Sequence, residues 1–147
     1  MGLLDRLGGR EDVPGVGLFV DGPNVLRSEF DVDLDDIRAF GAEEGAVRLA
    51  RLYLDENAPA SLVQAAEERG FEVTVTSGDV DVRLAVDATA AAVQHVVDTL
   101  VVVSRDSDFK PVLERAAARG VETVALAPGE YGRSDALRNA AQRSLTL

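Results

Sequence analysis

Runs of apolar residues of strand length alternate along this chain with segments that have the spacing of amphipathic helices. Val16–Val20 and Leu100–Ser104 are continuous apolar runs, which are typical of strands buried on both faces of a sheet. Elsewhere apolar and polar residues alternate, as in strands with one buried face. The other expected strands are Ala46–Leu54, Phe71–Thr76 and Val121–Ala127, with Leu145–Leu147 as a candidate for a short last one.

The segments between these strands predict helices, several of them with start or stop residues. Gly70 and Gly120 stand where helices would end, and Pro59 stands where one would begin. Ser134 is a suitable N-cap for the last helix. The expected helices are one that opens within Asp31–Ile37 and is ended by Gly41 and Gly45, then Ala60–Arg69, Val82–Val97, Phe109–Arg119 and Ser134–Gln142.

Regular alternation of strand and helix predicts an α/β fold. We expect a doubly wound, mostly parallel sheet of about five strands with helices on both faces, which is a three-layer α/β/α sandwich. The length of 147 residues is suitable for one domain with a substantial core. Residues 1–15 combine glycines, a proline and mixed charges, so we expect a flexible N-terminal leader followed by a single domain over 16–147.

Composition narrows the class of protein further. Hydrophobic residues make up 46% of the chain but aromatic residues only 5%, so the core must consist mainly of Val, Leu and Ala. The absence of cysteine excludes disulfides, thiolate zinc sites and cysteine nucleophiles. No apolar run approaches the roughly 18 residues that would span a bilayer, and residues 1–10 do not resemble a secretory signal. The expected location is therefore the cytoplasm, without a membrane partner.

The net charge of −11 reflects 26 acidic residues against 15 basic ones. Lys110 is the only lysine. Such a charge counts against a general nucleic-acid binder, which is expected to be basic. It is similar to the composition of proteins from salt-accumulating, halophilic microbes, where a Debye length of about 3 Å in molar salt screens the repulsion. An ordinary acidic protein is the alternative.

Candidate chemistry begins where two predicted strands end at carboxylates. Asp21 follows the first apolar run, and Asp106 and Asp108 follow the run that ends at Ser104. Parallel α/β sheets bind ligands just beyond the carboxyl ends of their strands, so these acids are expected in one cleft. Crowded carboxylates repel one another unless a hard cation lies between them, which predicts a divalent-metal site.

Each of these acids also has a simpler structural interpretation. In the simpler interpretation Asp21, which stands before Gly22 and Pro23, starts a turn and has no further role. Asp108 is suitable as the N-cap of the helix that follows, whereas Asp106 has no comparable local role. Asp81 is expected to cap the helix over Val82–Val97.

Asp87 lies inside the same mostly apolar helix. A carboxylate there is costly unless it is paired or binds a metal, and the structural alternative is an ion pair with Arg83. His95 is the only histidine and is not near the acids in the sequence, so a histidine-based catalytic relay is excluded. The glycine-rich segments match neither a P-loop nor a dinucleotide-binding motif.

Four segments together resemble a NYN domain, a branch of the PIN-like nuclease superfamily. They occur in the family's order from about Val16 to the C-terminus, and Arg105 before the Asp-x-Asp pair resembles the archaeal-type branch. The segments are Asp21-Gly22-Pro23-Asn24, Gly78–Val82 with Leu84–Ala88, Ser104–Phe109, and Ser134 with Leu137–Ala141.

The resemblance implies a PIN-like fold and RNA cleavage that depends on Mg²⁺ or Mn²⁺. Its acidic set corresponds to Asp21, Asp87, Asp106 and Asp108, with Asn24 and Asp81 close by. Gln142 stands where relatives often have an acid. The expected supporting residues are Asn24, Asp81, Ser104, Arg105, Arg27, Ser134 and Asn139, and Arg83, Arg133 and Arg138 are further candidates for binding phosphates.

We therefore expect a ribonuclease that hydrolyses RNA phosphodiester bonds with a metal-activated water in an acidic cleft. In this hypothesis Asp21 and Asp106 are the central ligands, and Asp87 and Asp108 occupy outer or second-metal positions. The alternative is a non-catalytic adaptor that binds RNA or protein and retains the acidic pocket. A signalling receiver domain is disfavoured because its acid pair would not follow the fourth strand. RNA is the expected partner, and a homodimer is left open.

Overall fold

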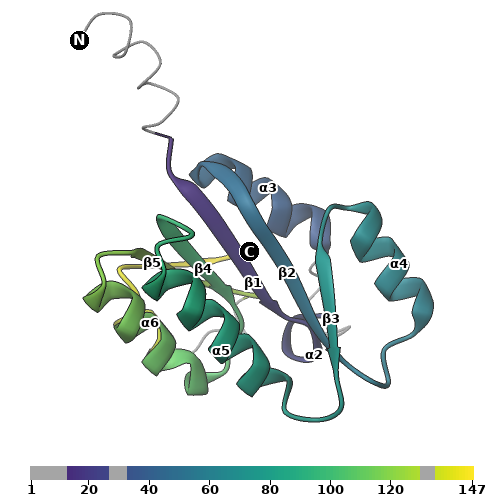
Figure 1. The fold of residues 1–147 in the computed structure, drawn as a ribbon. Helices are drawn as coiled ribbons and strands as arrows, with labels where there is room; N and C mark the ends of the chain where they lie inside the picture. The colour runs from purple at the N-terminus through teal and green to yellow at the C-terminus, as the bar shows by residue number, and fades with distance from the viewer. Residues whose placement is uncertain (1–12, 27–32, 130–134) are drawn as a thin grey trace, which may run out of the picture.

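The computed structural model describes residues 13–26, 33–129 and 135–147, and within them the chain forms a three-layer α/β/α sandwich (Figure 1). The predicted α/β fold is confirmed. All five strand pairs of the sheet are parallel, in the order β3-β2-β1-β4-β5-β6. The strands are β1 (Gly15–Asp21), β2 (Ala46–Asp55), β3 (Glu72–Thr76), β4 (Thr99–Val103), β5 (Glu122–Ala127) and β6 (Arg143–Thr146).

Helices cover both faces of this sheet. On one face α5 (Val80–Val93), α6 (Lys110–Ala118) and α7 (Asp135–Ala140) contribute to one apolar cluster, and on the other α3 (Leu34–Glu44) and α4 (Ala60–Glu68) contribute to a second. The short α2 (Gly22–Val25) follows β1, and a 3₁₀ turn, η2 (Ser107–Phe109), precedes α6. No helix in the described ranges is both long and apolar enough to cross a membrane.

The two central strands explain why the sheet has two cores. Every residue of β1 and β4 is buried, as their continuous apolar runs predict. Alternate side chains point to opposite faces of a strand. Phe19 and Val102 accordingly belong to the α5 side, and Val20 and Val103 to the α3 side. The strand order reverses between β1 and β4, so their carboxyl ends form the switch point at which doubly wound sheets bind ligands.

Some element boundaries differ from the prediction. Gly41 does not end α3 but is buried within it. It packs so closely on β1 that an added Cβ would lie 2.8 Å from Cδ1 of Leu18. The helix ends instead at Gly45. Helix α5 stops at Val93 rather than Val97, since His95 adopts a left-handed backbone conformation with φ of 54°. The sheet has a sixth strand, β6, which includes part of the candidate strand at Leu145–Leu147.

The predicted leader falls mainly on residues 1–12, which are outside the described ranges, so it stays a prediction.

Candidate metal centre

Strands β1 and β4 bring the first predicted acids together. Val20 pairs with Val103 in the parallel register, so the residues that follow each strand are neighbours. The Ser104 hydroxyl donates to Oδ2 of Asp21 over 3.0 Å, and the backbone N–H of Asp106 donates to the same hydroxyl, also over 3.0 Å. Ser104 therefore joins Asp21 to the Asp106 segment.

Asn24 makes a second connection between the ends of β1 and β4. Its side-chain oxygen accepts the backbone N–H of Arg105 over 3.0 Å. Asn24 lies in α2, which begins directly after β1 at Gly22. A Cβ on Gly22 would lie 2.5 Å from the carbonyl oxygen of Tyr53, so the chain turns closely over β2 at this point. The local sequence thus fixes Asn24 above the end of β4.

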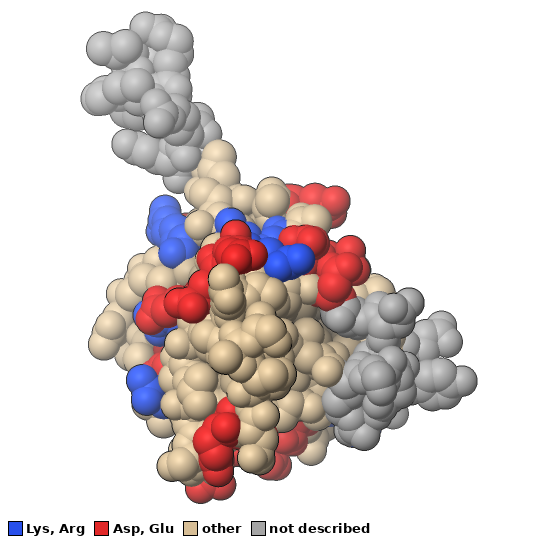
Figure 2. Space-filling view, turned by 90° about the vertical axis from the view of Figure 1, so that its right-hand side faces the viewer, with Lys and Arg blue, Asp and Glu red and all other residues tan. Residues whose placement is uncertain are grey.

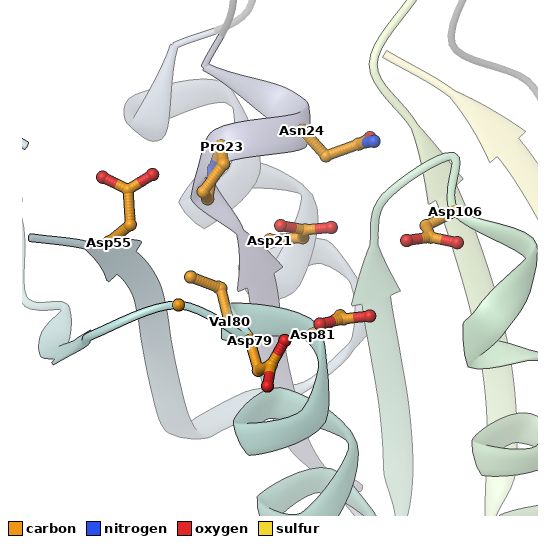
Figure 3. Close-up of a pocket in the computed structure, with 9 residues that line it drawn as sticks. Asp21, Pro23, Asn24, Asp55, Asp79, Val80, Asp81 and Asp106 are labelled. Atoms are coloured by element: carbon orange, nitrogen blue, oxygen red, sulfur yellow. The ribbon is translucent and has the colours of Figure 1, made fainter. Parts of the chain in front are cut away.

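An acidic cleft of about 390 Å³ opens at these strand ends (Figure 3). Figure 3 shows Asp21, Asp81 and Asp106 converging on one space from three different elements, with Asp55 standing apart at the end of β2. Among the described residues, those lining the cleft include no lysine or arginine. The lining residues are Asp21, Pro23, Asn24, Asp55, Gly78, Asp79, Val80, Asp81 and Asp106.

Three carboxylates form the tightest acidic group among the described residues. One oxygen each from Asp81, Asp106 and Asp108 all lie within 4.8 Å of one another. Asp81 is in the first turn of α5, and the other two belong to the turn before α6. Negative charges this close repel one another, and a cation between them would relieve the repulsion. Carboxylate oxygens are the ligands preferred by Mg²⁺ and Mn²⁺, so this donor set fits a hard divalent ion.

The local roles of two of these acids differ from the prediction. Asp106 caps η2, since its Oδ1 accepts the backbone N–H of Asp108 over 2.9 Å. The prediction that Asp106 has no local role is therefore wrong, as is the one that Asp108 is the N-cap. The reason is the 3₁₀ turn, which moves the cap two residues towards the N-terminus. Asp81 does not cap α5 either, because the helix already begins at Val80.

Asp21 is the buried acid of the cleft, with only 5% of its surface exposed. Burial raises the pKa of its carboxyl to about 6, although the hydrogen bond from Ser104 opposes this shift. The negative charges of Asp106 and Asp81 raise the pKa further. Asp21 therefore experiences the same crowding that the three-acid group shows by distance.

Asp87 is not brought into this group. Its Oδ2 accepts the Tyr53 hydroxyl over 2.8 Å, and Nε of Arg83 lies 3.2 Å from the same oxygen. The ion pair with Arg83 is thus the structural alternative that the sequence allowed. Burial and the neighbouring Asp87 carboxylate raise the pKa of Tyr53. These contacts attach α5 to β2, below the turn that carries Asp81.

The remaining predicted residues lie in several places. Arg27, Arg133 and Ser134 are outside the described ranges. Arg138 and Asn139 are exposed on α7 and do not line the cleft. Gln142 does not line the cleft. It connects the start of β6 to β5, because its backbone N–H and its side-chain oxygen both form hydrogen bonds with Thr123.

Two acids that line the cleft, Asp55 and Asp79, were not predicted from the sequence. Asp55 ends β2, directly beside β1, so the strand-end argument that found Asp21 applies to it equally. Asp79 immediately precedes α5. Asp79 could have been predicted from its position, because it lies in the connection that follows a strand and leads into a predicted helix.

Comparisons with known proteins agree with this architecture. A solved structure of a protein of unknown function from Vibrio parahaemolyticus superposes with a TM-score of 0.76, covering 92% of this chain and 93% of that one. Its 23% sequence identity makes it a likeness of fold alone.

A relative in sequence is an uncharacterized protein of Methanocaldococcus jannaschii, which is 42% identical over 126 residues, or 86% of this chain. The match covers 52% of that relative, so the chain spans about half of its length. The family model of the NYN domain matches residues 15–147, which includes every strand of the sheet and every acid of the cleft. The chain therefore belongs to the NYN domain family, within the PIN-like nuclease superfamily.

Proposed function

We propose that this chain is a ribonuclease that hydrolyses RNA phosphodiester bonds with Mg²⁺ or Mn²⁺ bound by Asp81, Asp106 and Asp108. The observation that carries the proposal is the convergence of their oxygens within 4.8 Å. NYN nucleases generally use divalent metals. The position of the group, at the carboxyl ends of β1 and β4, is where this class of sheet binds its ligands.

The spacing of the donor oxygens is close to what one bound ion requires. Oxygens that bind one Mg²⁺ at about 2.1 Å lie at most about 4.2 Å apart, so small side-chain rotations would complete the coordination. Asp108 is exposed and can rotate, whereas Asp106 is held by its cap to the N–H of Asp108. When bound, the ion would lower the pKa of a water molecule and neutralise charge on the phosphate.

The chain's own residues would then orient the reaction. Asp21 would act from the floor of the cleft, as an additional ligand or as the acceptor of a proton from the attacking water. Ser104 holds one of its oxygens, which fixes the carboxylate relative to Asp106. Asn24 is locked onto the backbone of Arg105 and would keep the rim of the cleft rigid. In this proposal Asp87 positions α5, and therefore Asp81, through Tyr53.

Cleavage assays with a conservative variant test the proposal. Asp106→Asn keeps an oxygen that can accept the N–H of Asp108, so the cap and the fold should survive while one ligand charge is lost. We expect Mn²⁺-dependent cleavage of single-stranded RNA to fall by at least about 100-fold. Glu114→Gln, which removes an exposed acid of α6 away from the cleft, is the matched control. Equal activity of both variants would refute the assignment.

A second candidate function is an adaptor that binds RNA or protein without cleaving it. It is favoured by the net charge of −11 and by the lack of a basic residue among the described residues that line the cleft. Calorimetric titration with Mn²⁺ separates the two functions. Tight binding that is lost in Asp106→Asn supports the nuclease, and no binding up to millimolar Mn²⁺ supports the adaptor.

A further inference from the structure

A groove of about 610 Å³ lies between α5 and α6, which stand beside each other on the same face of the sheet (Figure 1). Six of the nine residues that line it are Ala, Val or Pro, and one of them, Val86, is 60% exposed. Val86 and Val93 of α5 form part of one wall, and Val112 of α6 belongs to the other. Such walls are suited to a ligand that has apolar faces.

Asp108 connects this groove to the candidate metal centre. It lines the groove, and one of its oxygens lies within 4.8 Å of oxygens of Asp81 and Asp106. Asp81 and Asp106 line the acidic cleft instead. The three-acid group therefore lies between two hollows, and a substrate can approach an ion bound there from either of them.

The acidic cleft is the less suitable approach for a polyanion. Its lining includes Asp55 and Asp79, which do not belong to the three-acid group and would keep their charge when an ion is bound there. No lysine or arginine is among the described residues that line it. These carboxylates would repel the phosphates of a nucleic acid that entered from this side.

Helix α6 supplies the opposite charge along the groove. Within its bounds Lys110 and Arg115 stand against Glu114, which gives a net charge of +1, and no other helix that the structure describes has a net positive charge. Arg115 lines the groove, and its guanidinium has no ion-pair partner among the described residues. A guanidinium in this state can bind a phosphate through two parallel hydrogen bonds.

Helix α4, on the other face of the sheet, shows the contrast. It carries Glu67 and Glu68 and no basic residue. Figure 2 shows the side of the molecule on which α4 lies in Figure 1, with basic side chains among acidic ones in its upper part and acidic ones at its lower end. The strands run downward in Figure 1, so acids mark this side at the end where the metal centre lies.

We propose that single-stranded RNA reaches the metal centre along the groove between α5 and α6, with nucleobases against the apolar walls and a phosphate bound by Arg115. The proposal rests on the proposed function, because it takes RNA as the substrate. A rise of about 1.5 Å per residue puts Arg115 roughly 10 Å from Asp108 along the helix. The groove therefore holds nucleotides that neighbour the one whose phosphate contacts the ion.

The lining of the groove also indicates which RNA it accepts. The bases of a duplex are paired and stacked, so only a single strand can place them against the walls. Thr89 is the only uncharged polar residue of the lining. The groove thus offers few hydrogen bonds to base edges, through which one base is distinguished from another. Binding should depend on a single strand and only weakly on its sequence.

Fluorescence anisotropy of a labelled single-stranded oligouridylate tests the proposal. Ca²⁺, which takes the same oxygen ligands, replaces Mn²⁺ so that the readout is binding and not cleavage. Val86→Glu places a carboxylate at an exposed position of the wall, and Arg115→Gln removes the cation. We expect each variant to weaken binding at least about fivefold. Arg115→Gln should also reduce the slope of log K against log salt by about 0.7, which corresponds to one phosphate contact on a single strand.

Two variants outside the groove and the cleft are the matched controls. Val75→Glu makes the same change at a valine of β3 that is 51% exposed, and Arg69→Gln removes an exposed arginine at the end of α4. Both should bind the single strand within about twofold of the wild type. A duplex of the same length should bind to the wild type at least about tenfold more weakly than the single strand.

The outcomes separate this proposal from the ribonuclease proposal. Groove variants that bind as tightly as their controls would overturn the groove and leave it to another ligand, such as an amphipathic helix. A wild type that binds no RNA, or that binds the duplex as tightly as the single strand, would also overturn it. Groove-dependent binding without Mn²⁺-dependent cleavage would support the groove and refute the ribonuclease.

Discussion

At the scale of single residues, Asp21 lies where the buried core meets the candidate metal centre. Its carboxyl group is buried and adjacent to Asp106, and only the Ser104 hydroxyl among its side-chain partners favours the charged form. An acid in this position reduces the stability of the protein without metal. This loss of stability can be measured.

The first prediction concerns Asp21→Asn in the absence of metal. The carboxyl titrates near 3.8 when unfolded and near 6 when folded, so the folded state binds more protons between these values. Its contribution is therefore most favourable below pH 3.8 and is lost as the pH rises through 6. Removing the charge should stabilise the protein at pH 8 by roughly 1–3 kcal/mol and by much less at pH 4.

Urea unfolding of both proteins at the two pH values, in EDTA, measures this difference. Glu114→Gln controls for loss of an exposed acid. A stability difference that is the same at both pH values would contradict a raised pKa for Asp21. Titration of the wild type with Mn²⁺ should also show weaker binding below about pH 6, where protons compete for the site.

The second prediction separates Asp81 from Asp87. Asp87→Asn retains an acceptor for the Tyr53 hydroxyl, so we expect Mn²⁺ affinity to change by less than about threefold. Asp81→Asn removes a charge from the three-acid group and should lower affinity by at least about tenfold. Calorimetric titration of the two variants gives the comparison. A loss for Asp87→Asn equal to that for Asp81→Asn would return Asp87 to the ligand set.

At the scale of elements, the strands that position the site could be predicted, but the way the helices that complete it dock on the sheet could not. The continuous apolar runs of β1 and β4 identify them as central strands, and Asp21 and Asp106 follow from their ends. Asp81 depends on how α5 docks on the sheet, which involves Tyr53 of a different strand. Asp87 has the same residue type and lies on the same helix, so sequence pattern cannot decide between them.

The turn between β1 and α2 gives the third prediction. Gly22 leaves no room for a side chain, since a Cβ would lie 2.5 Å from the backbone oxygen of Tyr53. We expect Gly22→Ala to reduce the free energy of unfolding by roughly 1–3 kcal/mol through overpacking. Because α2 carries Asn24, the same variant should weaken Mn²⁺ binding.

Gly78→Ala is the contrasting variant for this measurement. A Cβ added at Gly78 would have no atom within 4 Å apart from its chain neighbours, but the φ of +85° disfavours any side chain. We expect a cost of about 1 kcal/mol from backbone strain alone. Unfolding in urea compares the two, and a Gly22→Ala protein as stable as the wild type would show that α2 can move away from β2.

At the scale of the whole molecule, the dominant property is the excess of 26 acidic over 15 basic residues. Acidic residues also lie on the surface away from the cleft, for example Glu67 and Glu68 of α4, which are exposed. Mutual repulsion of these charges opposes the compact state. The repulsion acts over the Debye length, so the stability of the protein should respond to salt.

The fourth prediction is that KCl stabilises this protein. Raising the salt from about 0.15 M to 1 M shortens the Debye length from roughly 8 Å to 3 Å and screens repulsion between separated acids. We expect a gain of about 1–2 kcal/mol, which corresponds to roughly 3–8 °C in Tm for a chain of this size. Thermal unfolding in EDTA measures this gain in stability free of metal binding.

The double variant Glu67→Gln/Glu68→Gln carries less charge, so its gain in stability with salt should be smaller. An identical gain would assign the effect to general salting out instead of charge repulsion, and a falling Tm would show that ion pairs such as Arg69 with Asp35 outweigh the repulsion.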